Sequence, residues 1–238
     1  MDLHYGICYY IGKDKKSNII NHYKAFNQVP QKNKTFWISF TIDEKDPHKR
    51  SLICKNKIKS LNIKVSYVHD YNWGGTIAAL FKLFQHLQTK KGYLAFFEED
   101  FIPINTIWLP DSIKYLQNYY YIGEGTIPSI DYPDLCQVKV CDSRYMKSYK
   151  FKKLYQNEAW TDGGFYFSTI QKFSQIYSII GIFHKGDQNT KYDHGNDGID
   201  YGEVGFPTLL FNNKLKFAGL LREKYFIHNE NELENPTT

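Results

Sequence analysis

The sequence is poor in cysteine and has no long apolar run. It holds four cysteines among 238 residues, with no CxxC pair and no framework spacing. Cys8 and Cys54 lie in apolar segments, so we expect them to be small buried side chains. No apolar stretch approaches the roughly 20 residues of a membrane span, and the N-terminus lacks the regions of a signal peptide. These absences predict a soluble, cytoplasmic protein with no transmembrane segment.

Charge of one sign is also scarce. The formal net charge is +5, and the basic residues are dispersed along the chain. The densest cluster, in residues 147–153, would suit an anionic ligand or a membrane surface, but ordinary surface is the simpler interpretation. A nucleic-acid-binding protein should carry a stronger basic stripe and a recognition motif. We therefore expect no nucleic-acid partner.

Several common catalytic fingerprints are missing. No G-x-G-x-x-G follows the first predicted strand, which argues against a dinucleotide oxidoreductase. No G-x-x-x-x-G-K-[ST] is present, which excludes a P-loop NTPase. There is also no G-x-S-x-G elbow and no cysteine in an electropositive frame.

What the sequence does have is a regular alternation of strands and helices in its first half. This pattern predicts an α/β fold with a doubly wound, mostly parallel sheet and helices on both faces. We expect a single domain over residues 1–238, with halves at 1–101 and 102–228 and a flexible tail at 229–238. The first half is predicted to contain strands at 3–11, 35–41, 63–67 and 92–101, separated by helices at 17–26, 46–60 and about 76–91.

The second half is less regular, and its predicted elements are more widely spaced. We expect an irregular loop from Gly125 to about Lys153, of a length that is more often functional than accidental. The other predicted elements are a helix at 105–119, strands at 120–123, 164–168 and 214–221, a helix ending near 180, a loop at 183–190, a helix leading into 208–211, and an apolar end at 225–228.

The fourth predicted strand ends in three carboxylates, Glu98, Glu99 and Asp100. Side chains alternate along a strand, so Glu98 and Asp100 should point one way and Glu99 the other. Ligands of open α/β sheets bind beyond the carboxyl ends of the strands. Two hard oxygen ligands there suit Mg²⁺ or Mn²⁺ holding a diphosphate. The alternative is a charged cap that only keeps the strand end hydrated.

A resemblance to a known family rests on this strand and on the turn before it. The stretches Asn72-Trp-Gly-Gly-Thr-Ile-Ala-Ala-Leu80 and Gly92-Tyr-Leu-Ala-Phe-Phe-Glu-Glu-Asp100 are similar to the core of GT-A-fold glycosyltransferases, family 2-like. The likeness covers residues 1–101 and, more loosely, 160–220. It implies a smaller acceptor-side region and a glycosyltransferase, hexosyl or pentosyl, that uses Mn²⁺ or Mg²⁺. The donor would be a UDP- or GDP-sugar, and inverting transfer would reach the hydroxyl of a glycan, glycoprotein or lipid-linked acceptor.

The same resemblance implies roles on the donor side. Asp100 would bind the metal, and Glu98 would contact the ribose or a metal-bound water, although members usually carry Asp at that first position. His228 matches a final metal-binding histidine, with a structural histidine as the alternative. Among the remaining donor-side residues, Tyr9 and Tyr10 would lie against the nucleotide base, and Asp43 would hydrogen-bond to it. Asn72 and Gly74 would lie beside the diphosphate. The alternative for Asp43, Asn72 and Gly74 is that they are ordinary turn residues with no contact to a ligand.

On the acceptor side, the resemblance implies contacts from Trp160, Asp162 and Gly163, with a buried core tryptophan as the alternative for Trp160. The catalytic base would be Asp197, or Asp200 as second choice. Both lie in residues 196–203, where aligning Asp200 with the last acid of the family motif puts Gly198 at the position of the base. This mismatch keeps open the alternative of a catalytically silent sugar- or nucleotide-binding module. A retaining transferase is a further alternative.

A nucleotidyltransferase of this sheet type is a further alternative. Such enzymes have a Gly-rich phosphate loop after the first strand. Here that position reads Tyr9-Tyr-Ile-Gly-Lys-Asp14, which carries only one glycine. We therefore rank this activity below glycosyl transfer.

Overall fold

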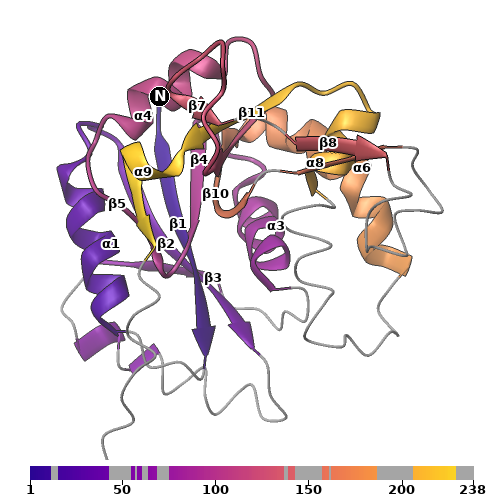
Figure 1. Ribbon diagram of the computed structural model, residues 1–238. Helices are drawn as coiled ribbons and strands as arrows, with labels where there is room; N and C mark the ends of the chain where they lie inside the picture. Colours follow the sequence, from indigo (N-terminus) through magenta and orange to yellow (C-terminus); the bar gives the residue numbers. More distant parts are fainter. Residues whose placement is uncertain are drawn as a thin grey trace, which may run out of the picture.

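A computed structural model describes the protein at residues 1–11, 16–42, 55–56, 58–60, 64–68, 75–136, 139–142, 157–160, 162–186 and 206–228 (Figure 1). Helices cover both faces of a central sheet in this part of the chain. None of the described helices is long and apolar enough to cross a bilayer.

The central sheet has eight strands in the order β3-β2-β1-β4-β10-β6-β11-β7. Strands β3, β2, β1 and β4 are parallel to one another, β10 runs against its neighbours β4 and β6, and β11 is parallel to β6. The carboxyl ends of β1, β2 and β4 therefore meet the start of β10 at one edge. The strands are β1 (Leu3–Ile11), β2 (Lys34–Ile42), β3 (Ser66–Val68), β4 (Tyr93–Glu98), β6 (Tyr121–Gly125), β7 (Leu135–Cys136), β10 (Asp162–Thr169) and β11 (Phe217–Leu221).

The helices divide between the two faces because the side chains of each strand alternate. Tyr5 and Ile7 of β1 join a core with helices α1 (Lys16–Gln28) and α4 (Trp108–Tyr115). Cys8 joins the opposite core, with α3 (Gly75–Leu87), α6 (Ile170–Gly186) and α8 (Phe206–Asn212). Helices on both faces of a mostly parallel sheet confirm the predicted fold class.

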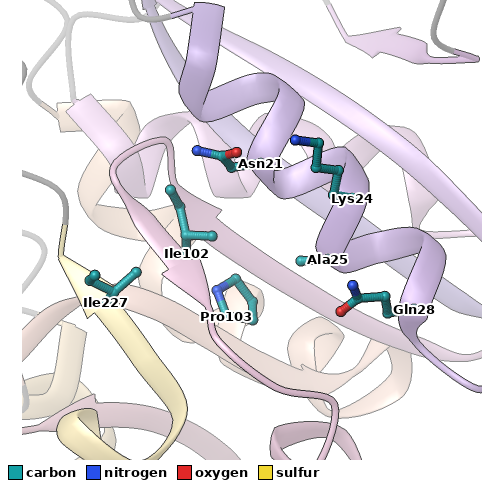
Figure 2. Close-up of a pocket in the computed structure, with 7 residues that line it drawn as sticks. All are labelled: Asn21, Lys24, Ala25, Gln28, Ile102, Pro103 and Ile227. Atoms are coloured by element: carbon teal, nitrogen blue, oxygen red, sulfur yellow. The ribbon is translucent and has the colours of Figure 1, made fainter.

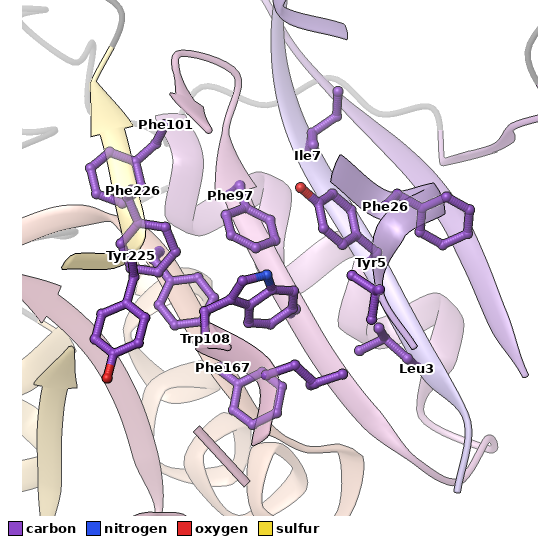
Figure 3. Close-up of a cluster of buried hydrophobic side chains, with 14 of the residues drawn as sticks. Leu3, Tyr5, Ile7, Phe26, Phe97, Phe101, Trp108, Phe167, Tyr225 and Phe226 are labelled. Atoms are coloured by element: carbon purple, nitrogen blue, oxygen red, sulfur yellow. The ribbon is translucent and has the colours of Figure 1, made fainter. Parts of the chain in front are cut away.

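Aromatic side chains fill the core on the α1 and α4 side (Figure 3). The ring of Phe97 stacks on Tyr5 at 4.5 Å between centroids and meets Trp108 edge-on at 5.5 Å. Phe101 packs on Phe226 at 4.9 Å. Such pairs add about 0.5–1.5 kcal/mol each beyond the area they bury. Because Phe97 and Phe101 flank residues 98–100, this core anchors both ends of the acidic segment.

Two small antiparallel sheets complete the architecture. β5 (Phe101–Pro103) pairs with β12 (Phe226–His228), and β12 follows the short helix α9 (Arg222–Tyr225). The register places His228 opposite Phe101. β8 (Lys139–Asp142) pairs with β9 (Asn157–Trp160).

The structure corrects several predicted boundaries. The strand expected at 92–101 is two strands, because Glu99 and Asp100 form a turn between β4 and β5. The segment expected to be irregular from 125 to 153 contains β7 and β8. Helix α6 continues to Gly186, through residues expected to start a loop. In β7 and β8, pairing with strands distant in the sequence overrode the local turn signals.

Candidate functional site

The acidic segment begins with Glu98, the last residue of β4. Its carboxylate oxygen Oε1 accepts a hydrogen bond of 2.7 Å from the hydroxyl of Thr76. Thr76 is the second residue of α3, so Glu98 lies at the positive end of that helix dipole. The Glu98 side chain is therefore held at the carboxyl edge of the sheet, on the α3 side. This bond from Thr76 was not predicted.

The three acids differ in exposure. Glu99 is only 2% exposed, while Glu98 and Asp100 are partly exposed. The backbone carbonyl oxygens of Glu98 and Glu99 both lie within hydrogen-bonding distance of Nε2 of His22, a buried residue of α1. The alternation from which the directions of these three side chains were predicted does not extend past Glu98, because Glu99 and Asp100 lie in a turn. His22 was not foreseen as part of this region.

Asp100 lies next to His228, far along the chain. Oδ2 of Asp100 and Nε2 of His228 are 3.7 Å apart, and the two side chains are 23% and 32% exposed. The β5–β12 pairing produces this proximity, because it sets His228 opposite Phe101. Both residues were sequence candidates for binding one metal ion, and the structure brings them together.

The spacing of Asp100 and His228 fits a shared divalent cation. Oxygen and nitrogen ligands lie about 2.0–2.2 Å from such an ion, so two ligands of one ion are roughly 3–4 Å apart. The observed 3.7 Å is in this range and exceeds a hydrogen bond. In the part of the chain that the structure describes, no three His, Cys, Asp or Glu residues are grouped for a metal. Two protein ligands suffice where substrate phosphates supply the others.

An ion pair between a buried carboxylate and a partly exposed arginine lies beside this turn. Glu124 of β6 is fully buried and accepts two hydrogen bonds of 2.9 Å from Nε and Nη2 of Arg222. The Arg222 guanidinium also stacks over the Phe101 ring, 5.3 Å from its centroid. Sequence reasoning missed this pair. The one signal was an acid in an otherwise apolar or small strand, Tyr121-Ile-Gly-Glu-Gly125.

The start of β10 approaches the acidic turn from the other side. Gly164 has φ +116°, and a Cβ there would lie 2.8 Å from the Phe101 ring. Asp162 pairs with Glu124 across the β10–β6 ladder, and the partly exposed Gly163 follows it. Of the predicted acceptor-side residues, Asp162 and Gly163 thus belong to strand β10 near the acidic turn. Trp160 ends β9, opposite Lys139.

The remaining predicted site residues have mixed placements. Tyr9 is only 3% exposed and packs in the core on the α1 side, which leaves little of its ring for a nucleotide base. Tyr10 is near the carboxyl end of β1. The other predicted residues, Asp43, Asn72, Gly74, Asp197 and Asp200, lie outside the described residues.

A separate groove of ≈ 350 Å³ runs between α1 and the β5–β12 ribbon (Figure 2). Ile102, Pro103 and Ile227 line one side of it. Asn21, Lys24, Ala25 and Gln28 line the α1 side. The lining contains no acid, so this groove supplies no carboxylate ligand for a cation and is distinct from the Asp100–His228 pair.

Sequence comparisons identify no family: no protein-family model matches the chain, and no curated protein matches its sequence. Structural comparison does find similar folds. A 4-diphosphocytidyl-2C-methyl-D-erythritol synthase from Anaerococcus prevotii aligns over 98% of this chain and 92% of its own, with TM-score 0.52 and 10% identity. This alignment, together with the strand order, decides the architecture. The fold is GT-A-like.

Two further structures are weaker matches to this GT-A-like chain. A proposed nucleotide-diphospho-sugar transferase from Desulfovibrio desulfuricans covers 92% of this chain and 80% of its own, with TM-score 0.45 and 10% identity. A mannosyltransferase from Pyrobaculum calidifontis, solved with GDP-Man and Mn²⁺, covers 53% of this chain and 36% of its own, with TM-score 0.37 and 11% identity. With TM-scores below 0.5, these two likenesses bear on neither the fold nor the function of this chain.

Proposed function

We propose that this protein is a metal-dependent glycosyltransferase that moves a sugar from a nucleoside-diphosphate sugar to an acceptor hydroxyl with inversion. The observation that supports it is the meeting of Asp100 and His228, 3.7 Å apart, at the carboxyl edge of a GT-A-like sheet. This edge is where ligands of open α/β sheets bind.

The proposed roles follow from position. Asp100 and His228 would hold Mn²⁺ or Mg²⁺, which when bound would neutralise charge on the leaving nucleoside diphosphate. Glu98, fixed by Thr76, would orient the ribose. Asp162 and Gly163 would line the acceptor side, with Trp160 before them. Asp197, or Asp200 as second choice, would take the proton of the attacking hydroxyl as general base.

One test separates this activity from its alternatives. Purified protein and Mn²⁺ would be incubated in one assay with UDP- or GDP-sugars and acceptors, and in a second with nucleoside triphosphates and sugar phosphates, and the released phosphate compound would be identified in each. Glycosyl transfer releases a nucleoside diphosphate, whereas a nucleotidyltransferase, suggested by the synthase of the same fold, releases pyrophosphate. The anomeric configuration of the product distinguishes inversion from retention. Binding without turnover would indicate a silent module.

A matched pair of variants tests the metal assignment. Asp100→Ala should lose the Mn²⁺-dependent rise in thermal midpoint seen with nucleoside diphosphates. Asp131→Ala, which removes an exposed acid in the segment between β6 and β7, should keep it. Equal behaviour of the two variants would contradict the proposed cation site.

A further inference from the structure

A buried chain of hydrogen bonds connects β1, α1 and the acidic turn. The Tyr5 hydroxyl lies 2.8 Å from Nδ1 of His22. Nε2 of the same ring lies 3.2 Å from the carbonyl oxygen of Glu98 and 3.1 Å from that of Glu99. Both Tyr5 and His22 are 0% exposed, so water supplies none of these bonds.

The direction of each bond follows from the chemistry of the partners. Carbonyl oxygens only accept hydrogen bonds, so Nε2 of His22 must carry the proton. Burial lowers the pKa of His22 to about 4, so the ring is neutral near pH 7 and Nδ1 holds a lone pair. The Tyr5 hydroxyl therefore donates to Nδ1. Tyr5 fixes the tautomer, and the tautomer presents an N–H to the turn.

The two carbonyls are those at which the chain leaves the sheet. β4 ends at Glu98, and Glu99 is in the turn that precedes Asp100. At this point of the chain, Nε2 of His22 lies within hydrogen-bonding distance of the carbonyl oxygens of two consecutive residues. Its ring is also packed beside Phe97, at 5.5 Å between centroids, so it has little freedom to move.

We propose that His22 is a positioning residue for the cation site. Its Nε2–H, oriented by Tyr5, donates to the carbonyls of Glu98 and Glu99, and these bonds fix the backbone conformation that places Asp100 next to His228. This inference rests on the proposed function, because it assumes a cation at Asp100. His22 itself contacts no ligand. Outer-shell groups that orient metal ligands typically change metal affinity by about 10–100-fold when they are replaced.

The test measures Mn²⁺ binding to the protein by electron paramagnetic resonance titration, with UDP or GDP present to supply phosphate ligands and with no sugar donor, so that no turnover occurs. His22→Phe keeps a ring and removes both nitrogens; we expect affinity to fall by about 10-fold or more. His22→Gln keeps an N–H near the position of Nε2, and we expect it to recover most of the loss. His4→Phe is the matched control. His4 is also buried, but it lies at the amino end of β1, beside Trp37, whereas the acidic turn lies at the carboxyl end of the strands. This variant should bind Mn²⁺ like the wild type.

Each result decides a separate question. A folded His22→Phe variant with wild-type affinity, or a His22→Gln variant as weak as His22→Phe, overturns the positioning role while leaving the proposed function intact. Wild-type Mn²⁺ binding that survives Asp100→Ala overturns the cation site and the inference with it. If His22→Phe does not fold, Tyr5→Phe takes its place, and unchanged affinity in that folded variant overturns the inference.

Discussion

Arg222 holds Glu124 through two parallel hydrogen bonds of 2.9 Å, although the residues are 98 positions apart in the sequence. The carboxylate is fully buried, while the Arg222 side chain is 26% exposed. Bidentate pairs of this kind fix geometry as well as charge. Arg222 is the first residue of α9, which leads directly into β12 and His228. The pair therefore anchors the segment that carries one proposed cation ligand.

Arg222→Met should destabilise the fold strongly. It leaves the buried Glu124 carboxylate without its cation, and breaking a buried pair in this way costs about 3–5 kcal/mol. Lys224→Met is the matched control on the same helix, because Lys224 pairs with Asp134 where both side chains are over one-third exposed. That loss should stay below about 1 kcal/mol. Urea unfolding of the two variants makes the comparison, and equal losses would contradict it.

Thr76→Val should loosen Glu98. The substitution removes the hydroxyl that donates to the Glu98 carboxylate at 2.7 Å and keeps the side-chain shape. A hydrogen bond to a charged group contributes about 1.5–3 kcal/mol, and partial exposure of Glu98 places the expected loss at the lower end. Thr76→Ser retains the hydroxyl and should stay near wild type. The urea concentrations at the unfolding midpoints of the two variants test this prediction. If Thr76→Ser is as unstable as Thr76→Val, the hydroxyl has no stabilising role.

Stability should fall between pH 6.5 and about 4 because of His22. Its pKa is lowered from 6.5 to about 4 in the folded protein, so the unfolded chain binds a proton that the folded one does not. Unfolding is then favoured as the pH falls, by up to about 3 kcal/mol over this window. His4, whose pKa burial also lowers, acts in the same direction.

Urea unfolding at pH 7 and pH 4.5 measures this slope. In His22→Phe the pH dependence should be smaller, and the part that His4 contributes should remain. An unchanged slope in that variant would show that another group titrates in this window.

The parallel half of the fold was predictable because its signals are local. Each apolar run, such as residues 3–11, and each amphipathic helix between such runs is readable within a short window. The acids at the end of β4 were equally visible. Their geometry was not, because it depends on His228 returning through β12 and on Arg222 reaching Glu124 across the chain. His22 was missed because its partners include backbone carbonyls, which leave no side-chain pattern.

Gly164→Ala should disturb the acidic turn through Phe101. The backbone there has φ +116°, which a residue with a side chain rarely adopts, and the added Cβ would lie 2.8 Å from the Phe101 ring. A strained conformation of this kind costs about 1–3 kcal/mol before the contact is counted. Gly164→Ala combined with Phe101→Leu relieves the contact but keeps the backbone strain. The loss of stability in this double variant should therefore be smaller than the sum of the losses in the two single variants. Because Phe101 follows Asp100, the single variant should also bind Mn²⁺ more weakly. A Gly164→Ala protein as stable as the wild type would contradict the close approach of β10 to this ring.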